Sequence, residues 1–195
     1  MRSRADLHEY QRRAIAMMLE QPKVYLAIGM GLGKTVSALT AVADLKAQGE
    51  PVKVLVIAPK KVAESVWPNE PGEWQHLSGL SISLVTGSVS ERALALTKKA
   101  DVYVVGRDNV AWLVDHLKTW SFNLLIIAEA SSFKNPSSKR FKALRKVRAL
   151  VERCWMLSGT PAPNGLLDLW PQYFILDGGQ RLGRTFSAYR SAYFT

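Results

Sequence analysis

The stretch that decides the fold is "KVYLAIGMGLGKTVSALTAVADLKAQG", residues 23–49. Its first six residues are rich in β-branched and aromatic side chains, which predicts a strand. A glycine-rich turn follows, and residues 34–49 predict a helix that stops at Gly49. A strand, a glycine-rich turn and a helix in this order are the parts of a phosphate-binding loop.

The turn reads "IGMGLGKT", residues 28–35. Its three glycines let the backbone curl so that successive N–H groups point at one anion. Lys34 and Thr35 open the helix, where a lysine can reach the outer phosphates and a hydroxyl can bind Mg²⁺. The strict pattern G-x-x-x-x-G-K-[ST] is not met, because Ile28 holds its first glycine position. We therefore predict a site for a nucleoside triphosphate, and a glycine-rich turn with a chance lysine is the alternative.

Five more apolar runs follow along the chain, and segments of helical character separate most of them. They are residues 52–58, 81–87, 100–106, 122–128 and 153–159. Runs of this kind are typical of strands in a parallel sheet that is covered on both faces. The sequence therefore predicts an open α/β domain with ligands at the carboxyl ends of the strands. A first helix is expected over residues 7–19, with the inward candidates Leu7, Ala14, Met17 and Met18.

Composition and charge narrow the class of protein. The chain has 195 residues, 48% of them hydrophobic, and a net charge of +10. This charge favours a polyanionic partner, with nucleic acid ahead of an acidic membrane surface. No apolar run approaches the roughly 20 residues of a membrane span, and the start lacks the apolar stretch of a secretory signal. The single cysteine, Cys154, fits a reducing, cytoplasmic compartment. It is expected to be a core thiol, and most of the tryptophans are expected in the core too.

A later strand, "LLIIAEASSFKN" (residues 124–135), ends in an acid, Glu129. A strand that delivers carboxylates to a phosphate site normally delivers two adjacent acids. Ala128 stands where the first of them would be, and a methyl group cannot anchor Mg²⁺ or its water. The sequence thus contains half of an acidic metal site.

Together with "LHEYQ", "LVIAP" and "MLSGTP", these stretches resemble the first motor lobe of superfamily-two helicases. More narrowly, they resemble the Snf-like (Swi/Snf) branch of double-stranded-DNA translocases, in the small form of phages and bacteria. That branch usually has M-G-L-G-K-T in its phosphate loop, as residues 30–35 do. Its acidic box usually reads D-E-A-x-x-x-K-N, which is matched from Glu129 to Asn135. The resemblance covers nearly the whole chain and implies that residues 1–195 form a single RecA-like ATP-binding lobe.

The resemblance implies a role for each matched residue. Gln11 would read the adenine, Lys34 would bind the outer phosphates, and Glu129 would orient the attacking water as general base. Mg²⁺ would bind Thr35. The triphosphate would be held by Gly29, Met30, Gly31, Leu32, Gly33, Lys34 and Thr35. The coupling between the nucleotide state and DNA binding would depend on Ser158, Gly159 and Thr160. An ordinary polar helix residue at position 11 and a plain turn at 158–161 are the alternatives.

Loops at the strand ends hold the DNA backbone in this family, and here they read "APKK", "VTGS" and "VGRDN". The implied contacts to double-stranded DNA come from Lys60, Lys61, Arg107 and Asn109. Such contacts are independent of base sequence and weaken with salt. Solvated surface charges are the alternative for each lysine.

Residues 134–153 carry eight Lys or Arg residues and one acid, so seven of the ten net positive charges lie there. Phe141, Leu144, Val147 and Val151 fall at helical spacing within 138–152, which predicts one face packed on the sheet. The other faces are almost wholly basic. A second DNA-facing surface, a docking face for a partner lobe and a solvated helix are all compatible with this pattern.

The family's motor has two RecA-like lobes, and the second supplies arginines that act on the transferred phosphate. No second phosphate-handling block occurs here, so the chain is expected to be a piece of a longer protein, and a natural half-protein is the alternative. Ala128 is expected to impair hydrolysis further, because the family's aspartate at this position holds Mg²⁺. An engineered substitution is the simpler interpretation, and natural degeneration is the alternative.

Two other classes of function compete with a motor lobe. A DNA- or protein-binding module that kept the fold and lost the chemistry is favoured by Ala128 and by the missing second lobe. A kinase or another phosphate-loop ATPase is disfavoured, because "SGTP" and the K-N tail of the acidic box have no role there.

Overall fold

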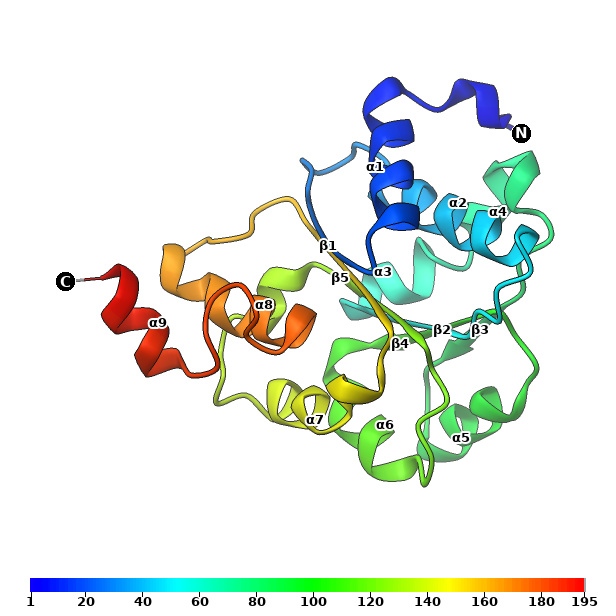
Figure 1. Ribbon diagram of the computed structural model, residues 1–195. Helices are drawn as coiled ribbons and strands as arrows, with labels where there is room; N and C mark the ends of the chain where they lie inside the picture. The colour runs from blue at the N-terminus through cyan, green and yellow to red at the C-terminus, as the bar shows by residue number, and fades with distance from the viewer. Residues whose placement is uncertain (195) are drawn as a thin grey trace.

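Within residues 1–194, which the computed structural model describes, six parallel strands form one sheet in the order β1-β6-β5-β2-β4-β3 (Figure 1). The strands are β1 (Lys23–Ala27), β2 (Val54–Ala58), β3 (Ile82–Val85), β4 (Val102–Gly106), β5 (Leu124–Ala128) and β6 (Arg153–Ser158). Every residue of the central strands β2 and β5 is buried, whereas the edge strands β1 and β3 alternate between buried and more exposed residues. The predicted α/β fold with a parallel sheet is confirmed.

Helices cover both faces of this sheet (Figure 1). One face carries α1 (Glu9–Glu20), α2 (Lys34–Ala47), α3 (Lys60–Ser65) and α4 (Glu70–Glu73). The other face carries α5 (Val89–Thr97), α6 (Val110–His116), α7 (Lys139–Val147), α8 (Leu169–Asp177) and α9 (Phe186–Tyr193). Short 3₁₀ helices lie between them, namely η1 (Arg4–Asp6), η2 (Gln75–Leu77), η3 (Arg107–Asn109), η4 (Ala130–Phe133), η5 (Arg148–Leu150) and η6 (Leu166–Asp168).

The core is divided into two layers because successive side chains of a strand point to opposite faces. In β2, Val54 and Val56 pack under α1 and α2, whereas Leu55 and Ile57 pack against α5 to α8. A central strand therefore needs an apolar residue at every position, because its side chains are buried on both sides of the sheet. This explains why the central strands read as continuous apolar runs.

The first helix differs from its prediction in detail. It begins at Glu9, so Leu7 is buried in the segment before it, and Ala14 and Met18 are buried as expected. The prediction for Met17 is wrong, since 43% of its surface is exposed. Ala14 and Met18 are four residues apart and lie on the buried face, and Met17 falls at the border of that face.

The basic stretch is shorter as a helix than predicted. Helix α7 ends at Val147, η5 follows, and Val151 is buried after the helical segment has ended. Phe141 and Leu144 pack in the core as expected. Cys154 is buried in β6, where burial raises the pKa of its thiol to about 12, as fits a core thiol. Four of the tryptophans are buried core residues, namely Trp67, Trp74, Trp155 and Trp170.

Candidate functional site

The phosphate loop spans the gap between β1 and α2 at the carboxyl end of the sheet. Gly31 and Gly33 adopt left-handed backbone conformations, with φ of 73° and 71°. Gly33 is the residue that precedes α2, so the loop turns sharply and then opens directly into the first turn of the helix. The first amides of α2 therefore face the same space as the loop.

Lys34 folds over this loop. Its Nζ donates to the carbonyl oxygens of Ile28 at 2.8 Å and Gly29 at 2.9 Å. Burial lowers the pKa of Lys34, and the nearby charge of Glu129 acts in the opposite direction. The structure thus brings together the predicted lysine of the phosphate loop and the predicted acid of β5.

Gln11 supports the phosphate loop from the side of α1. Its Oε1 accepts a hydrogen bond from the backbone N–H of His8 at 2.8 Å, and its Nε2 donates to the carbonyl of Leu32 at 3.3 Å. The Tyr10 hydroxyl donates to the same carbonyl at 3.2 Å. Only 5% of Gln11 is exposed. Each amide atom retains capacity for one more hydrogen bond, so the adenine-reading role stays a prediction beside this bracing role.

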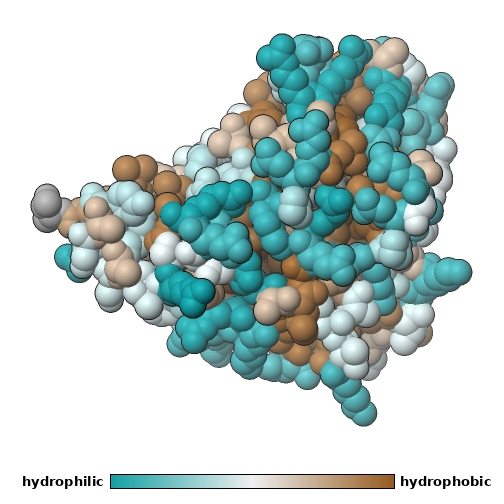
Figure 2. All heavy atoms as spheres, in the orientation of Figure 1, coloured by the Kyte–Doolittle hydropathy of each residue, from teal (hydrophilic) through white to brown (hydrophobic). Residues whose placement is uncertain are grey.

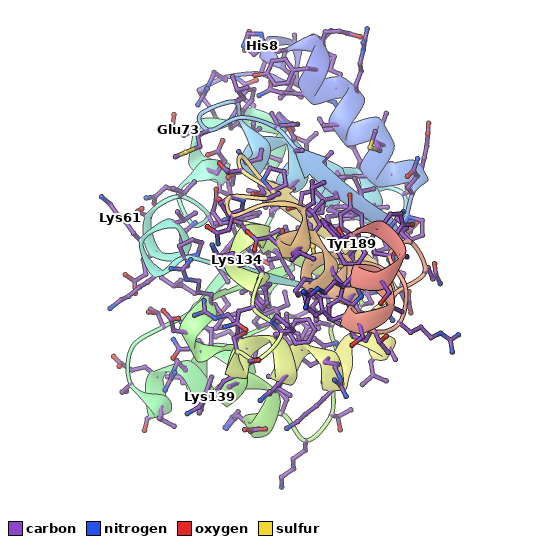
Figure 3. The ribbon with its side chains drawn as sticks, turned by 90° about the vertical axis from the view of Figure 1, so that its left-hand side faces the viewer. His8, Lys61, Glu73, Lys134, Lys139 and Tyr189 are labelled. Atoms are coloured by element: carbon purple, nitrogen blue, oxygen red, sulfur yellow. The ribbon has the colours of Figure 1, made fainter. Side chains whose placement is uncertain are left out.

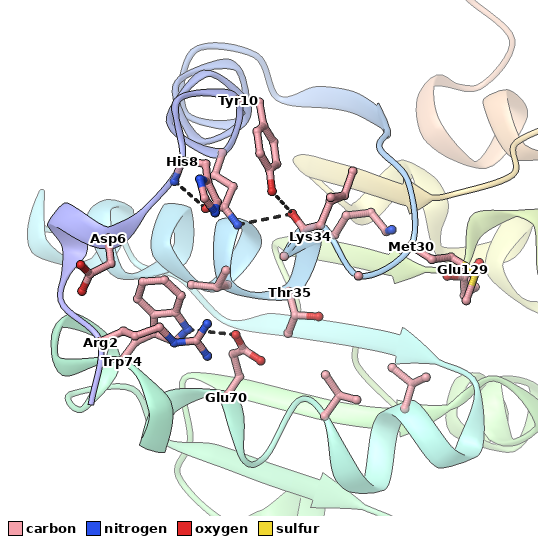
Figure 4. Close-up of a pocket in the computed structure, with 17 residues that line it drawn as sticks. Arg2, Asp6, His8, Tyr10, Met30, Lys34, Thr35, Glu70, Trp74 and Glu129 are labelled. Carbon is pink, nitrogen blue, oxygen red and sulfur yellow. Dashed lines mark hydrogen bonds between the residues drawn. The ribbon is translucent and has the colours of Figure 1, made fainter.

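A pocket of about 620 Å³ opens beside the loop (Figure 4). Its lining includes residues 30–36, Gln11 and Glu129, so the pocket unites most of the predicted nucleotide residues. Gly29 and Ala128 are not part of this lining. The remaining wall comes from the N-terminal segment and from the region of α3 and α4.

That remaining wall was missed by the sequence prediction. The Arg2 guanidinium lies over the Trp74 ring, 4.5 Å from its centre, and the Trp74 Nε1 donates to Glu70 at 3.1 Å (Figure 4). Burial raises the pKa of Glu70. Arg2 and Trp74 also form an isolated parallel β-bridge. These residues are about 70 positions apart, and no local pattern pairs them.

Glu129 follows β5 in a left-handed conformation with φ of 59°. It is the one non-glycine residue within 1–194 with a positive φ, and such conformations favour glycine. Ala128, directly before it, is 8% exposed at the end of the strand. The described residues contain no cluster of three His, Cys, Asp or Glu that could hold a metal ion. Mg²⁺ at this site would therefore depend on Thr35, nucleotide phosphates and water, a donor set that Mg²⁺ accepts.

The predicted coupling residues lie against the phosphate loop. Ser158 ends β6, and its carbonyl accepts from the Ile28 N–H at 3.1 Å. Its Oγ accepts from the Thr160 N–H at 3.2 Å. A Cβ on Gly159 would lie 3.2 Å from the Met30 side chain and 3.3 Å from the Met30 nitrogen. The phosphate loop and this turn are therefore in direct contact.

The predicted DNA-contacting residues are only partly brought together. Lys60 and Asn109 line one groove of about 590 Å³ at the carboxyl ends of β2 to β4, and Glu64 and Asp108 line it too. Lys61 is exposed beside this groove and does not line it. Arg107 is half-buried, and its Nε makes no hydrogen bond within the described residues.

Arg92 of α5 is a second residue that the sequence prediction missed. Its guanidinium lies over the Trp112 ring, 4.2 Å from the ring centre, and donates a hydrogen bond to the Asn109 side chain. It therefore links α5 to the groove-lining loop of η3. No motif marks this arginine, because its partners come from another part of the chain.

Arg92→Ala is expected to lower the free energy of unfolding by about 1–3 kcal/mol, because it removes the cation–π contact and one hydrogen bond. Arg92→Lys should retain part of the ring contact, so its free energy of unfolding should fall less. Urea unfolding followed by tryptophan fluorescence measures the free energy of unfolding of both variants. Equal stability of the Arg92→Ala variant and the unaltered chain would contradict this account of the link.

A parallel sheet covered by helices on both faces, with a glycine-rich phosphate loop after one strand and an acid after another, is typical of RecA-like phosphate-loop domains. The chain belongs to the SNF2-related domain family, whose family model matches residues 10–187. It is also similar to the SWI2/SNF2 ATPase core of Sulfolobus solfataricus in complex with dsDNA. That match has a TM-score of 0.81 and 26% identity, and covers 95% of this chain and 38% of the other.

Two curated relatives illustrate the range of the family. "Putative protein p41" of Acyrthosiphon pisum secondary endosymbiont phage 1 is 40% identical over 193 residues. The ATP-dependent helicase FUN30 of Saccharomyces cerevisiae is 34% identical over 177 residues. These matches cover 95% and 84% of this chain, but the chain spans only 42% and 15% of the two relatives. Within residues 1–194 the structure contains no helix with the length and apolar character that crossing a membrane requires.

Proposed function

We propose that residues 1–195 form the first RecA-like lobe of a Snf-like DNA translocase, and that this lobe binds ATP with Mg²⁺. The observation that carries the proposal is the single pocket lined by Gln11, Lys34, Thr35 and Glu129. Lys34 supplies positive charge for the outer phosphates, and Thr35 supplies a hydroxyl for the metal. Glu129 is the proposed general base that orients the attacking water.

The parent protein is proposed to move on double-stranded DNA, with a second RecA-like lobe completing the site. A neighbour solved in complex with dsDNA supports the choice of duplex DNA, and this chain covers 38% of that neighbour. The strand-end groove beside Lys60 and Asn109 is the proposed contact surface for the phosphate backbone. Glu64 and Asp108 reduce the local positive charge there, so lysine and arginine outside the groove are expected to contribute.

The 40% identity to a phage protein supports the small phage or bacterial type. Ala128 replaces the family's acidic-box aspartate, and we propose that it impairs hydrolysis. The pocket still contains Lys34, Thr35 and Glu129. The lobe should therefore retain nucleotide binding while losing an anchor for the metal.

ATP is expected to stabilise the chain even without hydrolysis. At about 100 times its Kd, a ligand that binds only the folded state adds roughly 2.7 kcal/mol. For a domain of this length that corresponds to a rise in melting temperature of roughly 5–11 °C. AMP is the matched control ligand, because it has the base and lacks the outer phosphates. A melting temperature that ATP leaves unchanged at millimolar concentration would contradict the proposed nucleotide site.

A further inference from the structure

We propose that three exposed cations of α7, Lys139, Lys142 and Arg145, form a second surface for the phosphate backbone of duplex DNA. The inference rests on the proposed action on duplex DNA and adds a surface outside the strand-end groove. Figure 3 shows three labelled lysines in the left half of the view, which are, from higher to lower, Lys61, Lys134 and Lys139.

The charge of α7 is only partly neutralised by its surroundings. The helix has the sequence KRFKALRKV, with five cations and no acid in nine residues. Two of the five are paired with acids, since Arg140 lies 3.3 Å from Asp108 and Lys146 lies 3.5 Å from Asp115. The other three are exposed and make no salt bridge with any residue of 1–194.

The exposed side of α7 fits a polyanion better than a protein partner. Its large apolar residues Phe141 and Leu144 are buried in the core, and no large apolar side chain of this helix is exposed. The centre of a protein–protein interface is normally apolar and depleted of charge, particularly of lysine. Hydrophilic atoms lie at the lower left of centre in Figure 2, where α7 lies in Figure 1, and a hydrophobic area adjoins them.

The position of α7 makes its cations continuous with the strand-end groove. Arg140 in its first turn reaches Asp108, which lines that groove beside Asn109. The helix then runs along α6, as the ion pair between Lys146 and Asp115 shows. A duplex that lies along the groove could therefore extend onto the surface of α7, which itself carries no acidic residue.

The spacing of the three cations suits a duplex. Intervals of three residues keep neighbouring side chains on one side of a helix. Lys139 and Arg145 are six residues apart, which is about 9 Å along the axis at about 1.5 Å per residue. Duplex DNA carries one phosphate charge per about 1.7 Å of axis, so roughly five charges occupy this length. Each cation can thus meet a phosphate without any base being read.

The test measures binding of a fluorescent duplex of mixed sequence to the 195-residue chain at several salt concentrations. The variant is Lys139→Gln/Lys142→Gln/Arg145→Gln, which retains long polar side chains with good helix propensity. The matched control is Lys98→Gln/Lys99→Gln/Lys118→Gln, which removes the same number of exposed charges. The control residues lie in the segments before β4 and β5, at the amino ends of these strands. Melting temperatures establish that both variants are folded.

We expect the α7 variant to bind at least tenfold more weakly at low salt, and the slope of log K against log salt to fall by roughly 2–3, about 0.9 per lost phosphate contact. The control variant should change both quantities much less. Equal losses in the two variants would indicate a general charge effect and overturn the inference.

A parallel variant, Lys60→Gln/Lys61→Gln, separates this inference from the proposed function. If it weakens binding while the α7 variant does not, the strand-end surface stands and α7 belongs to a protein partner or to solvent. If the unaltered chain binds no duplex even at low salt, the proposed action on DNA fails, and the inference about α7 fails with it.

Discussion

Ala128→Asp is expected to raise DNA-stimulated ATP hydrolysis by about 10–100-fold in a longer form of the protein that carries a second RecA-like lobe. Ala128 ends β5 directly before Glu129, and Glu129 lines the pocket of the phosphate loop. An aspartate there would supply a negative charge and an acceptor for metal-bound water. Mg²⁺ neutralises charge between the outer phosphates, so its loss from the correct position slows phosphoryl transfer.

The same substitution has a measurable effect in the 195-residue chain alone. ATP affinity should become more strongly dependent on Mg²⁺, and calorimetric titration with and without a chelator measures this dependence. Ala128→Asn is the matched control, because it has the size of aspartate and lacks the charge. It should behave like the unaltered chain. If the aspartate variant binds nucleotide while hydrolysis in the two-lobed protein stays at background, the role given to position 128 is wrong.

Local patterns were sufficient to predict the fold and the phosphate loop. The strand of residues 23–27, the glycines of the turn and the helix from Lys34 are neighbours in the chain, so their chemistry is visible as one motif. The central strands were equally clear because burial on both faces demands apolar residues at every position. Strand ends were overestimated by one or two residues, as at Ile28, Ser81 and Val52, which lie just outside β1, β3 and β2.

The remaining wall of the pocket and the link between α5 and η3 could not be predicted, because both depend on segments that are distant in sequence. Arg2 meets Trp74 only after α1 to α4 have packed on the sheet, and Arg92 meets Asn109 only across the gap between α5 and η3. Gln11 was predicted as a residue that contacts the base, and the structure adds two hydrogen bonds that brace its neighbours. Side-chain direction of this kind is decided by tertiary packing, which motif spacing does not contain.

Gly33→Ala is expected to lower the free energy of unfolding by roughly 2–5 kcal/mol, which urea unfolding can measure. The left-handed conformation of Gly33 alone costs an alanine about 1–2 kcal/mol. A Cβ at this position would also lie 2.1 Å from the Gln11 Nε2, so the amide must move away. Its hydrogen bonds to His8 and Leu32 would then be lost, at about 0.5–1.5 kcal/mol each. ATP affinity should fall too, because the loop can no longer present its N–H groups together.

Gly31→Ala is the matched control, since Gly31 has nearly the same φ and a Cβ there would meet no atom within 4 Å. It should lose only the conformational part, about 1–2 kcal/mol. A double-mutant cycle with Gln11→Ala isolates the part of the loss that depends on the Gln11 amide. Once Gln11 has been shortened to alanine, the new methyl group at position 33 has no amide to displace. In that background Val36 Cγ1, at 3.2 Å, is the remaining close neighbour of the new Cβ. We therefore expect Gly33→Ala to cost little more than Gly31→Ala there, which gives a coupling energy of roughly 1–3 kcal/mol between positions 11 and 33. Additive losses would mean that Gln11 accommodates the new methyl group freely, and would remove the basis for its bracing role in the phosphate loop.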